Sequence, residues 1–132
     1  MSNMHAIRVY PTLLTLLTLA SCSTELRETA RIISPDGHAV AVLIWVYGGG
    51  AAGSATRHIY IAEANAKSFE HPILSTTHCE SLSMSWTDSN TLQVNYESNC
   101  SIKAFENHWY SPAAIQNAQP ATVEIILNRK AL

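Results

Sequence analysis

The chain has 132 residues, a length that normally forms one domain. Its 8 lysines and arginines are outnumbered by 10 aspartates and glutamates, and no basic run occurs, which argues against nucleic-acid binding and against a polybasic membrane-surface site. Charged residues make up only 14% of the chain, and Val, Ile, Thr and Tyr are frequent, which favours a folded β-rich domain over a disordered stalk.

The first residues have the arrangement of a secretory signal peptide. Arg8 supplies a positive charge with no acid nearby, and an apolar stretch follows from Val9 to Ala20. The segment ends at Leu19-Ala20-Ser21-Cys22, an aliphatic residue, two small residues and a cysteine. A short positive region, a short apolar region and small residues at the end are typical of a cleaved export signal.

The last four residues of this segment resemble the lipobox of bacterial lipoprotein precursors. The resemblance implies cleavage before Cys22, a lipid on its thiol, and a protein anchored in the bacterial cell envelope. Ser23 stands where Asp usually marks inner-membrane retention, so it implies the outer membrane, facing the periplasm. Plain secretion and a membrane-spanning anchor are the alternatives, although spanning needs about 20 apolar residues and this run is shorter.

The expected organisation is a signal peptide over residues 1–21, the lipidated cysteine with a polar tether over 22–30, and a β domain over 31–132. Residues 31–33 predict a brief strand, and Ser34-Pro35-Asp36-Gly37 predicts a turn, because proline presets φ and glycine accepts a positive φ. Residues 39–47 are apolar on both alternating faces, which indicates a strand covered on both sides.

Further strands are predicted over residues 57–62 and 121–127, with an irregular segment over 68–77 and a loop or short helical turn over 112–120. The clearest hairpin signal comes from residues 81–86 and 91–96, which alternate polar and apolar side chains around a turn. The fold class expected is mainly β: a small antiparallel meander or sandwich-like sheet in a single domain after the cleaved signal peptide. The predicted core consists of Val42, Ile44, Ile59, Ile61, Leu82, Met84, Trp86, Leu92, Val94, Ile125 and Leu127.

Three cysteines are present. If Cys22 is acylated, Cys79 and Cys100 remain, and an even pair in an exported domain predicts a disulfide. With residues 87–90 as the hairpin loop, Trp86 would face Thr91, so the bond is expected just beyond the end of the ladder. Two free thiols or a metal pair are the alternatives.

Two weaker resemblances concern the mature chain. Ser34-Pro35-Asp36-Gly37 with residues 39–44, residues 58–61, and residues 84–92 together look like one blade of a periplasmic β-propeller. A propeller needs at least about four blades, and only one copy is present here. The resemblance therefore implies a four-stranded meander rather than a propeller. The turn and the W-x-D-x-x-x-L hairpin at Trp86 are also similar to uncharacterised small bacterial lipoproteins, which implies location and fold and no activity.

The chain contains fragments of catalytic and cofactor-binding patterns, but their sequence context does not fit those functions. Residues 48–53 read G-x-G-x-x-G, but a strand rather than a helix follows, so no cofactor is expected. His71, His78, Cys79 and Glu80 lack the tight repeated spacing of a zinc site, so no metal is expected. There is no G-x-S-x-G elbow, and no catalytic residue is assigned.

Trp109 and Tyr110 are predicted to lie in a loop, where aromatic side chains would offer a contact to a partner or would simply cover the end of a small core. The function expected is therefore a non-enzymatic binding module anchored to a membrane by lipid, with an envelope protein or the cell wall as its partner. A toxin-neutralising immunity lipoprotein is a sharper version. The alternative is a small envelope hydrolase acting on lipid or peptidoglycan.

Overall fold

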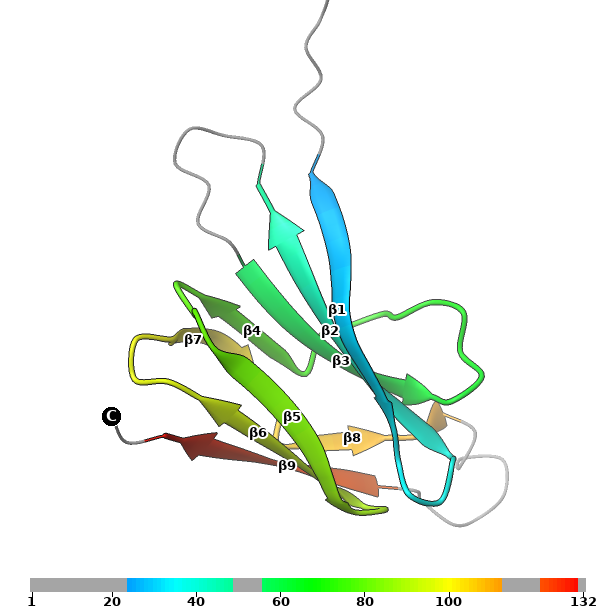
Figure 1. Cartoon of the computed structure of the whole chain (residues 1–132). Helices are drawn as coiled ribbons and strands as arrows, with labels where there is room; N and C mark the ends of the chain where they lie inside the picture. Colours follow the sequence, from blue (N-terminus) through cyan, green and yellow to red (C-terminus); the bar gives the residue numbers. More distant parts are fainter. Residues whose placement is uncertain (1–23, 49–55, 113–121, 131–132) are drawn as a thin grey trace, which may run out of the picture.

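The computed structural model describes residues 24–48, 56–112 and 122–130, and these ranges form two β-sheets (Figure 1). The first sheet, in the order β1-β2-β3-β4-β7, contains β1 (Glu25–Ile33), β2 (Ala39–Tyr47), β3 (Thr56–Glu63), β4 (Leu74–Thr77) and β7 (Ser101–Phe105). The second, in the order β5-β6-β9-β8, contains β5 (Leu82–Asp88), β6 (Thr91–Tyr96), β9 (Thr122–Arg129) and β8 (His108–Tyr110). The predicted fold class, a small and mainly β single domain, is confirmed.

The two sheets share one hydrophobic core, as expected for a sandwich in which each sheet covers the apolar face of the other. The first sheet contributes side chains such as Ala41 and Ile59, and the second contributes Leu92 and Ile125, all buried. Of the predicted core, seven residues are buried: Val42, Ile59, Ile61, Leu82, Leu92, Val94 and Ile125. Four are only partly buried, and all of these except Ile44 still pack against the core: Ile44, Met84, Trp86 and Leu127.

The chain order is a meander only through β1 to β4. The chain then enters the second sheet for β5 and β6, returns to pair β7 with β4, and enters the second sheet again for β8 and β9. The pair β6–β9 is parallel, with Leu92 opposite Ile125. The simple meander was wrong beyond β4, because alternation identifies a strand but does not identify its neighbour.

Several strands were missed or cut short by the sequence patterns. β1 begins at Glu25, so residues 25–30, expected to be tether, are paired with β2. β4 and β8 occur where irregular chain or loop was expected, and β7 lies in a stretch for which no element was predicted. Each is short and carries polar residues, so its backbone pairing with a longer neighbour, rather than its own apolar pattern, decides its conformation.

The turn between β1 and β2 forms as predicted. Gly37 has φ of 76°, and its amide donates to the carbonyl of Ser34 at 2.9 Å. The Ser34 hydroxyl donates to Asp36 at 2.6 Å and accepts from the amide of Ala39 at 3.0 Å. These bonds satisfy the buried hydroxyl and fix the register in which β1 and β2 pair.

The β5–β6 hairpin forms with a register different from the expected one. Trp86 faces Leu92 rather than Thr91, and the register shifts between Trp86 and Asp88. Thr87 is therefore an extra residue on β5, a bulge that a count from the turn cannot reveal. The Trp86 indole donates to the carbonyl of Ile32 at 3.2 Å, which joins this hairpin to the first sheet.

The prediction that β2 is covered on both faces is confirmed for its first five residues, whereas its last four are only half-buried. Ala41 faces the second sheet, Val42 faces the opposite way, and both have no exposed surface. Val42 lies between Arg31 and Tyr60 in the cross-strand register. The ring of Phe69, from the β3–β4 loop, lies 5.7 Å from the ring of Tyr60 and 5.6 Å from the guanidinium of Arg31, so this loop covers the outer face.

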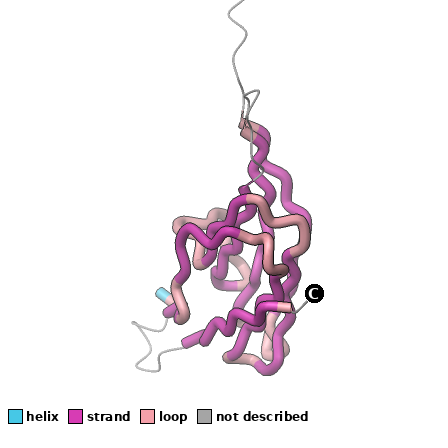
Figure 2. The backbone as a smooth tube through the Cα atoms, turned by 90° about the vertical axis from the view of Figure 1, so that its left-hand side faces the viewer, coloured by secondary structure: helices cyan, strands magenta, loops and turns pink. Residues whose placement is uncertain are grey.

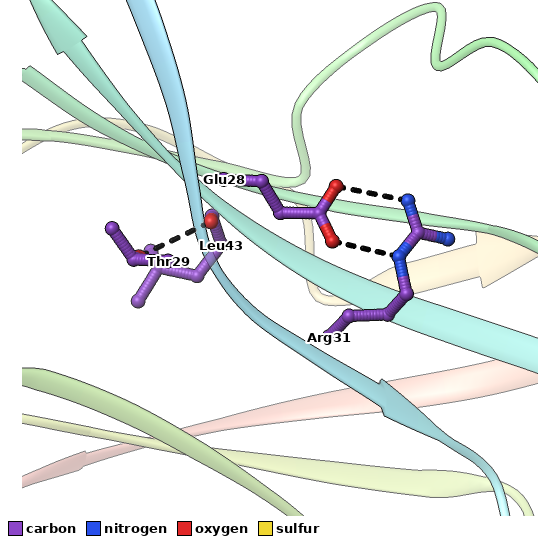
Figure 3. Close-up of polar contacts among 4 residues, drawn as sticks. All are labelled: Glu28, Thr29, Arg31 and Leu43. Carbon is purple, nitrogen blue, oxygen red and sulfur yellow. Dashed lines mark hydrogen bonds and ion pairs between the residues drawn. The ribbon is translucent and has the colours of Figure 1, made fainter.

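β1 forms one edge of the first sheet and carries a bulge (Figure 3). Thr29 is the extra residue, and its hydroxyl donates to the carbonyl of Leu43 at 3.2 Å. Glu28 and Arg31, on either side of it, form a two-bond ion pair of 2.7 and 2.9 Å. Charged side chains and bulges hinder an edge strand from pairing with another chain.

The environment of His58 predicts that the free energy of unfolding depends on pH. Its Nδ1 lies 2.7 Å from the Ser75 hydroxyl on the outer face of the first sheet, and burial lowers the pKa of the imidazole. The unfolded chain therefore binds the proton more readily, so the free energy of unfolding falls as the pH drops below about 6.5 and stops falling below the folded pKa.

Urea unfolding between about pH 7.5 and about pH 5 tests this prediction, because the lowered pKa values of Glu28 and Asp36 act only at more acid pH. His58→Gln should flatten the dependence, and the exposed His71→Gln serves as the control. An equal slope in all three proteins would contradict the role of His58.

Candidate functional site

A pocket of about 570 Å³ opens where the first sheet meets the short edge strand of the second. Its lining comes from the end of β3, the β3–β4 loop, the β7–β8 connection and β8. Backbone bonds hold these segments together: the amide of Ile73 donates to Ile59 at 2.8 Å, and the amide of Glu106 donates to Ile73 at 2.8 Å. The buried side chains of Ile61 and Ile73 contribute its apolar part.

The polar lining of the pocket is acidic. Glu63, Glu70 and Glu106 contribute carboxylates, and none of the described residues that line the pocket is lysine or arginine. Glu63 accepts a 2.6 Å hydrogen bond from the buried Ser111, which fixes one of its oxygens. A site with this lining favours a positively charged ligand or one rich in hydrogen-bond donors.

Trp109 and Tyr110 lie in β8, and the expected loop is wrong at these positions. Pairing of Trp109 with Val123 turns its indole inward, where it is half-buried against the core while also lining the pocket. Tyr110 points the other way with 66% of its surface exposed. Of the two aromatics, Tyr110 is therefore the one that is free to contact a partner.

Two histidines share the pocket with the carboxylates. His71 lies in the β3–β4 loop, and His108 stacks on Tyr110 with ring centroids 6.4 Å apart. In the part of the chain that the structure describes, neither imidazole is hydrogen-bonded to Glu70 or Glu106. A histidine that acts as a hydrolytic base is commonly oriented by a hydrogen bond to a carboxylate. The described structure does not provide that bond from Glu70 or Glu106 to either histidine.

The sequence patterns did not reveal this pocket. Its residues come from segments between positions 61 and 112, and six of the fourteen belong to the β3–β4 loop, most of which was predicted to be irregular chain. The spacing of the Glu and His residues in this loop does not indicate that the loop lies beside β8. The sequence feature that came closest to predicting the pocket was Trp109-Tyr110, which forms part of its lining.

Cys79 and Cys100 are joined by a disulfide with a Cα–Cα distance of 4.1 Å, as predicted. Both lie just outside the β5–β6 ladder, which ends at Leu82 and Tyr96. Cys79 is thereby excluded as a metal ligand. Among the residues described, no group of three or more His, Cys, Asp or Glu is placed to hold a metal ion.

Four features predicted from the sequence lie wholly or mostly outside the described residues: the signal peptide over residues 1–21, the lipidation site Cys22, residues 49–54 of the glycine-rich segment, and residues 113–120. In the described ranges there is no helix with the length and apolarity needed to cross a membrane. Comparison with known families, curated proteins and solved structures found no match for this chain.

Proposed function

We propose that this protein is a lipid-anchored protein of the bacterial envelope whose β domain binds a protein partner without catalysis. The observation that carries the proposal is the acidic, aromatic pocket beside β8. Three carboxylates surround an opening that Tyr110 borders, so a lysine or arginine side chain of the partner would find charge complementarity and an aromatic surface together.

The anchor supports the same proposal. A lipid on Cys22 would confine the domain close to the membrane, which raises its effective concentration toward proteins that arrive there. A basic protein, including a toxin that must cross the periplasm, is a partner of suitable chemistry for an acidic pocket. Carboxylates at such a surface also speed the encounter with a basic partner.

The test is capture of partners by the full-length anchored protein, cross-linked in envelope membranes and solubilised with detergent. Glu106→Gln removes one charge of the pocket and Tyr110→Ala removes its exposed ring. Each change is expected to lower affinity for the captured partner by about 5- to 30-fold, since contacts of this kind contribute about 1–2 kcal/mol. Binding should also weaken as salt is raised.

Glu80→Gln is the matched control, because it neutralises an exposed carboxylate that does not line the pocket. Equal capture by all three variants would contradict the proposed site.

A hydrolase is the rival function, favoured by the presence of His71 and His108 beside carboxylates. Turnover of phospholipid or peptidoglycan fragments that His108→Ala or His71→Ala abolishes would replace binding with catalysis.

A further inference from the structure

The ends of β1 and β2 project beyond the rest of the sandwich on the side where the chain enters the domain (Figures 1 and 2). We call this part the projecting end; it carries Leu26, Arg27, Trp45 and Tyr47, and Arg57 of β3 packs beside it. Leu26 has 66% of its surface exposed, one of the two highest values among the exposed large hydrophobic residues described. Single exposed apolar side chains are common on protein surfaces, and Ile33 at the other end of β1 is also exposed, so Leu26 is informative only together with its neighbours.

Aromatic and basic side chains gather on one face of the projecting end. Trp45 and Tyr47 stack with ring centroids 4.7 Å apart, and the guanidinium of Arg57 lies 4.3 Å from the Trp45 ring. Arg27 is the cross-strand neighbour of Trp45 on the other side. The bulge at Thr29 produces this arrangement, because without the extra residue Leu26 rather than Arg27 would share that face.

Polar groups at this end lack partners. The indole nitrogen of Trp45 and Nε of Arg57 are buried, and neither has a hydrogen-bond partner among the described residues. Both are donors, and because neither atom is exposed, an outside acceptor could reach them only after the side chains moved. Trp, Tyr and Arg on one face of the projecting end, with the exposed Leu26 on the other, belong to the residue types found at membrane–water interfaces.

The position of the anchor brings this end to a membrane. Three peptide links separate Cys22 from Glu25, so their Cα atoms are at most about 11 Å apart. Glu25 is paired with Tyr47, which puts the projecting end within the same reach. The interfacial layer of a bilayer leaflet is about 5–8 Å thick, so a lipid on Cys22 leaves these side chains within reach of that layer.

From these observations we infer that the projecting end of β1 and β2 rests in the lipid interface, with Leu26, Trp45 and Tyr47 as the inserted side chains. The inference rests on the proposed lipid anchor. It fixes the orientation of the domain: the tip of β1 and β2 faces the membrane, and the opposite end of the sandwich faces away from it.

The test uses the full-length protein, purified with its lipid and reconstituted in phosphatidylethanolamine–phosphatidylglycerol vesicles that contain brominated lipid. Bromine quenches tryptophan on contact, so fluorescence should fall in the wild type. Trp45→Phe should abolish the fall. Trp86→Phe is the matched control and should preserve it, because Trp86 bonds to Ile32, roughly 20 Å further along β1 from Glu25 at about 3.3 Å per residue.

Leu26→Ser provides a variant that retains every tryptophan, and it should weaken the quenching. Intact mass separates the two ways of failing. A lipidated protein whose Trp45 is not quenched overturns the membrane contact but not the anchor. If the fluorescence emission of Trp45 is blue-shifted in a way that depends on protein concentration, the surface is assigned to a second copy of the chain instead. A mass without lipid on Cys22 overturns both the anchor and the contact.

Discussion

Replacing Cys79 and Cys100 together with alanine is expected to lower the free energy of unfolding by about 3 kcal/mol. The bond has a sequence separation of 21, and closing a loop of this size removes conformational entropy mainly from the unfolded chain. For a domain of this size the loss corresponds to a fall in Tm of about 12–24 °C.

The location of the bond strengthens this expectation. The chain leaves the first sheet after β4 and returns to it with β7, and the two cysteines lie at the exit and at the return. The disulfide therefore closes the excursion that carries the β5–β6 hairpin. Thr77 and Ser101 pair beside the disulfide, so the native state keeps these two segments together with or without the bond. Loss of the bond is therefore expected to act mainly on the unfolded chain.

Thermal and urea unfolding, each with and without reductant, measure the effect. The wild type should lose stability when it is reduced, whereas the double variant should be insensitive to reductant, which controls for other effects of the thiol reagent. If the oxidised and the reduced wild type have the same free energy of unfolding, the disulfide does not restrict the unfolded chain as expected and the prediction is wrong.

Cys22→Ala is expected to abolish lipid attachment and processing altogether, because no other side chain in the Leu19-Ala20-Ser21-Cys22 sequence offers a thiol to acylate. The mature wild type should have a lipid on Cys22 and sediment with membranes. One acyl chain anchors a protein only marginally, whereas two or three anchor it stably, so loss of the thiol should release the domain from membranes or leave an uncleaved precursor.

Intact-mass analysis and membrane fractionation decide this prediction. Cys79→Ala is the control, because it also removes a thiol but should leave processing intact. Finding the wild type with an unmodified N-terminus at Met1 or Met4 would refute the anchor. Ser23→Asp should move a correctly processed protein from the outer to the inner membrane, if the residue after the cysteine directs sorting as the lipobox resemblance implies.

Local chemistry explains which parts of the fold could be predicted. The turn at Gly37 and the alternation around Leu82 and Leu92 act within a few residues, so their conformation follows from the sequence. The apolar run of β2 indicated burial on both faces for the same reason. Pairing of the two cysteines followed from their number and from the hairpin between them.

The remaining features depend on contacts between distant segments. Thr29 and Thr87 form bulges because of how their strands meet neighbours, and a bulge changes which side chains share a face. β8 is a strand only because β9 pairs with it, and that pairing turns Trp109 inward and Tyr110 outward.

The sequence by itself therefore determined the class of the domain, its central turns and strands and its disulfide. The tertiary structure alone decided the order of the strands in the two sheets, the acidic pocket beside β8 and the projecting end of β1 and β2. The physical reason is range: turn geometry and side-chain alternation are set by neighbours in the chain. A pocket or a surface is instead assembled by long-range pairing, for which this sequence carries no separate pattern.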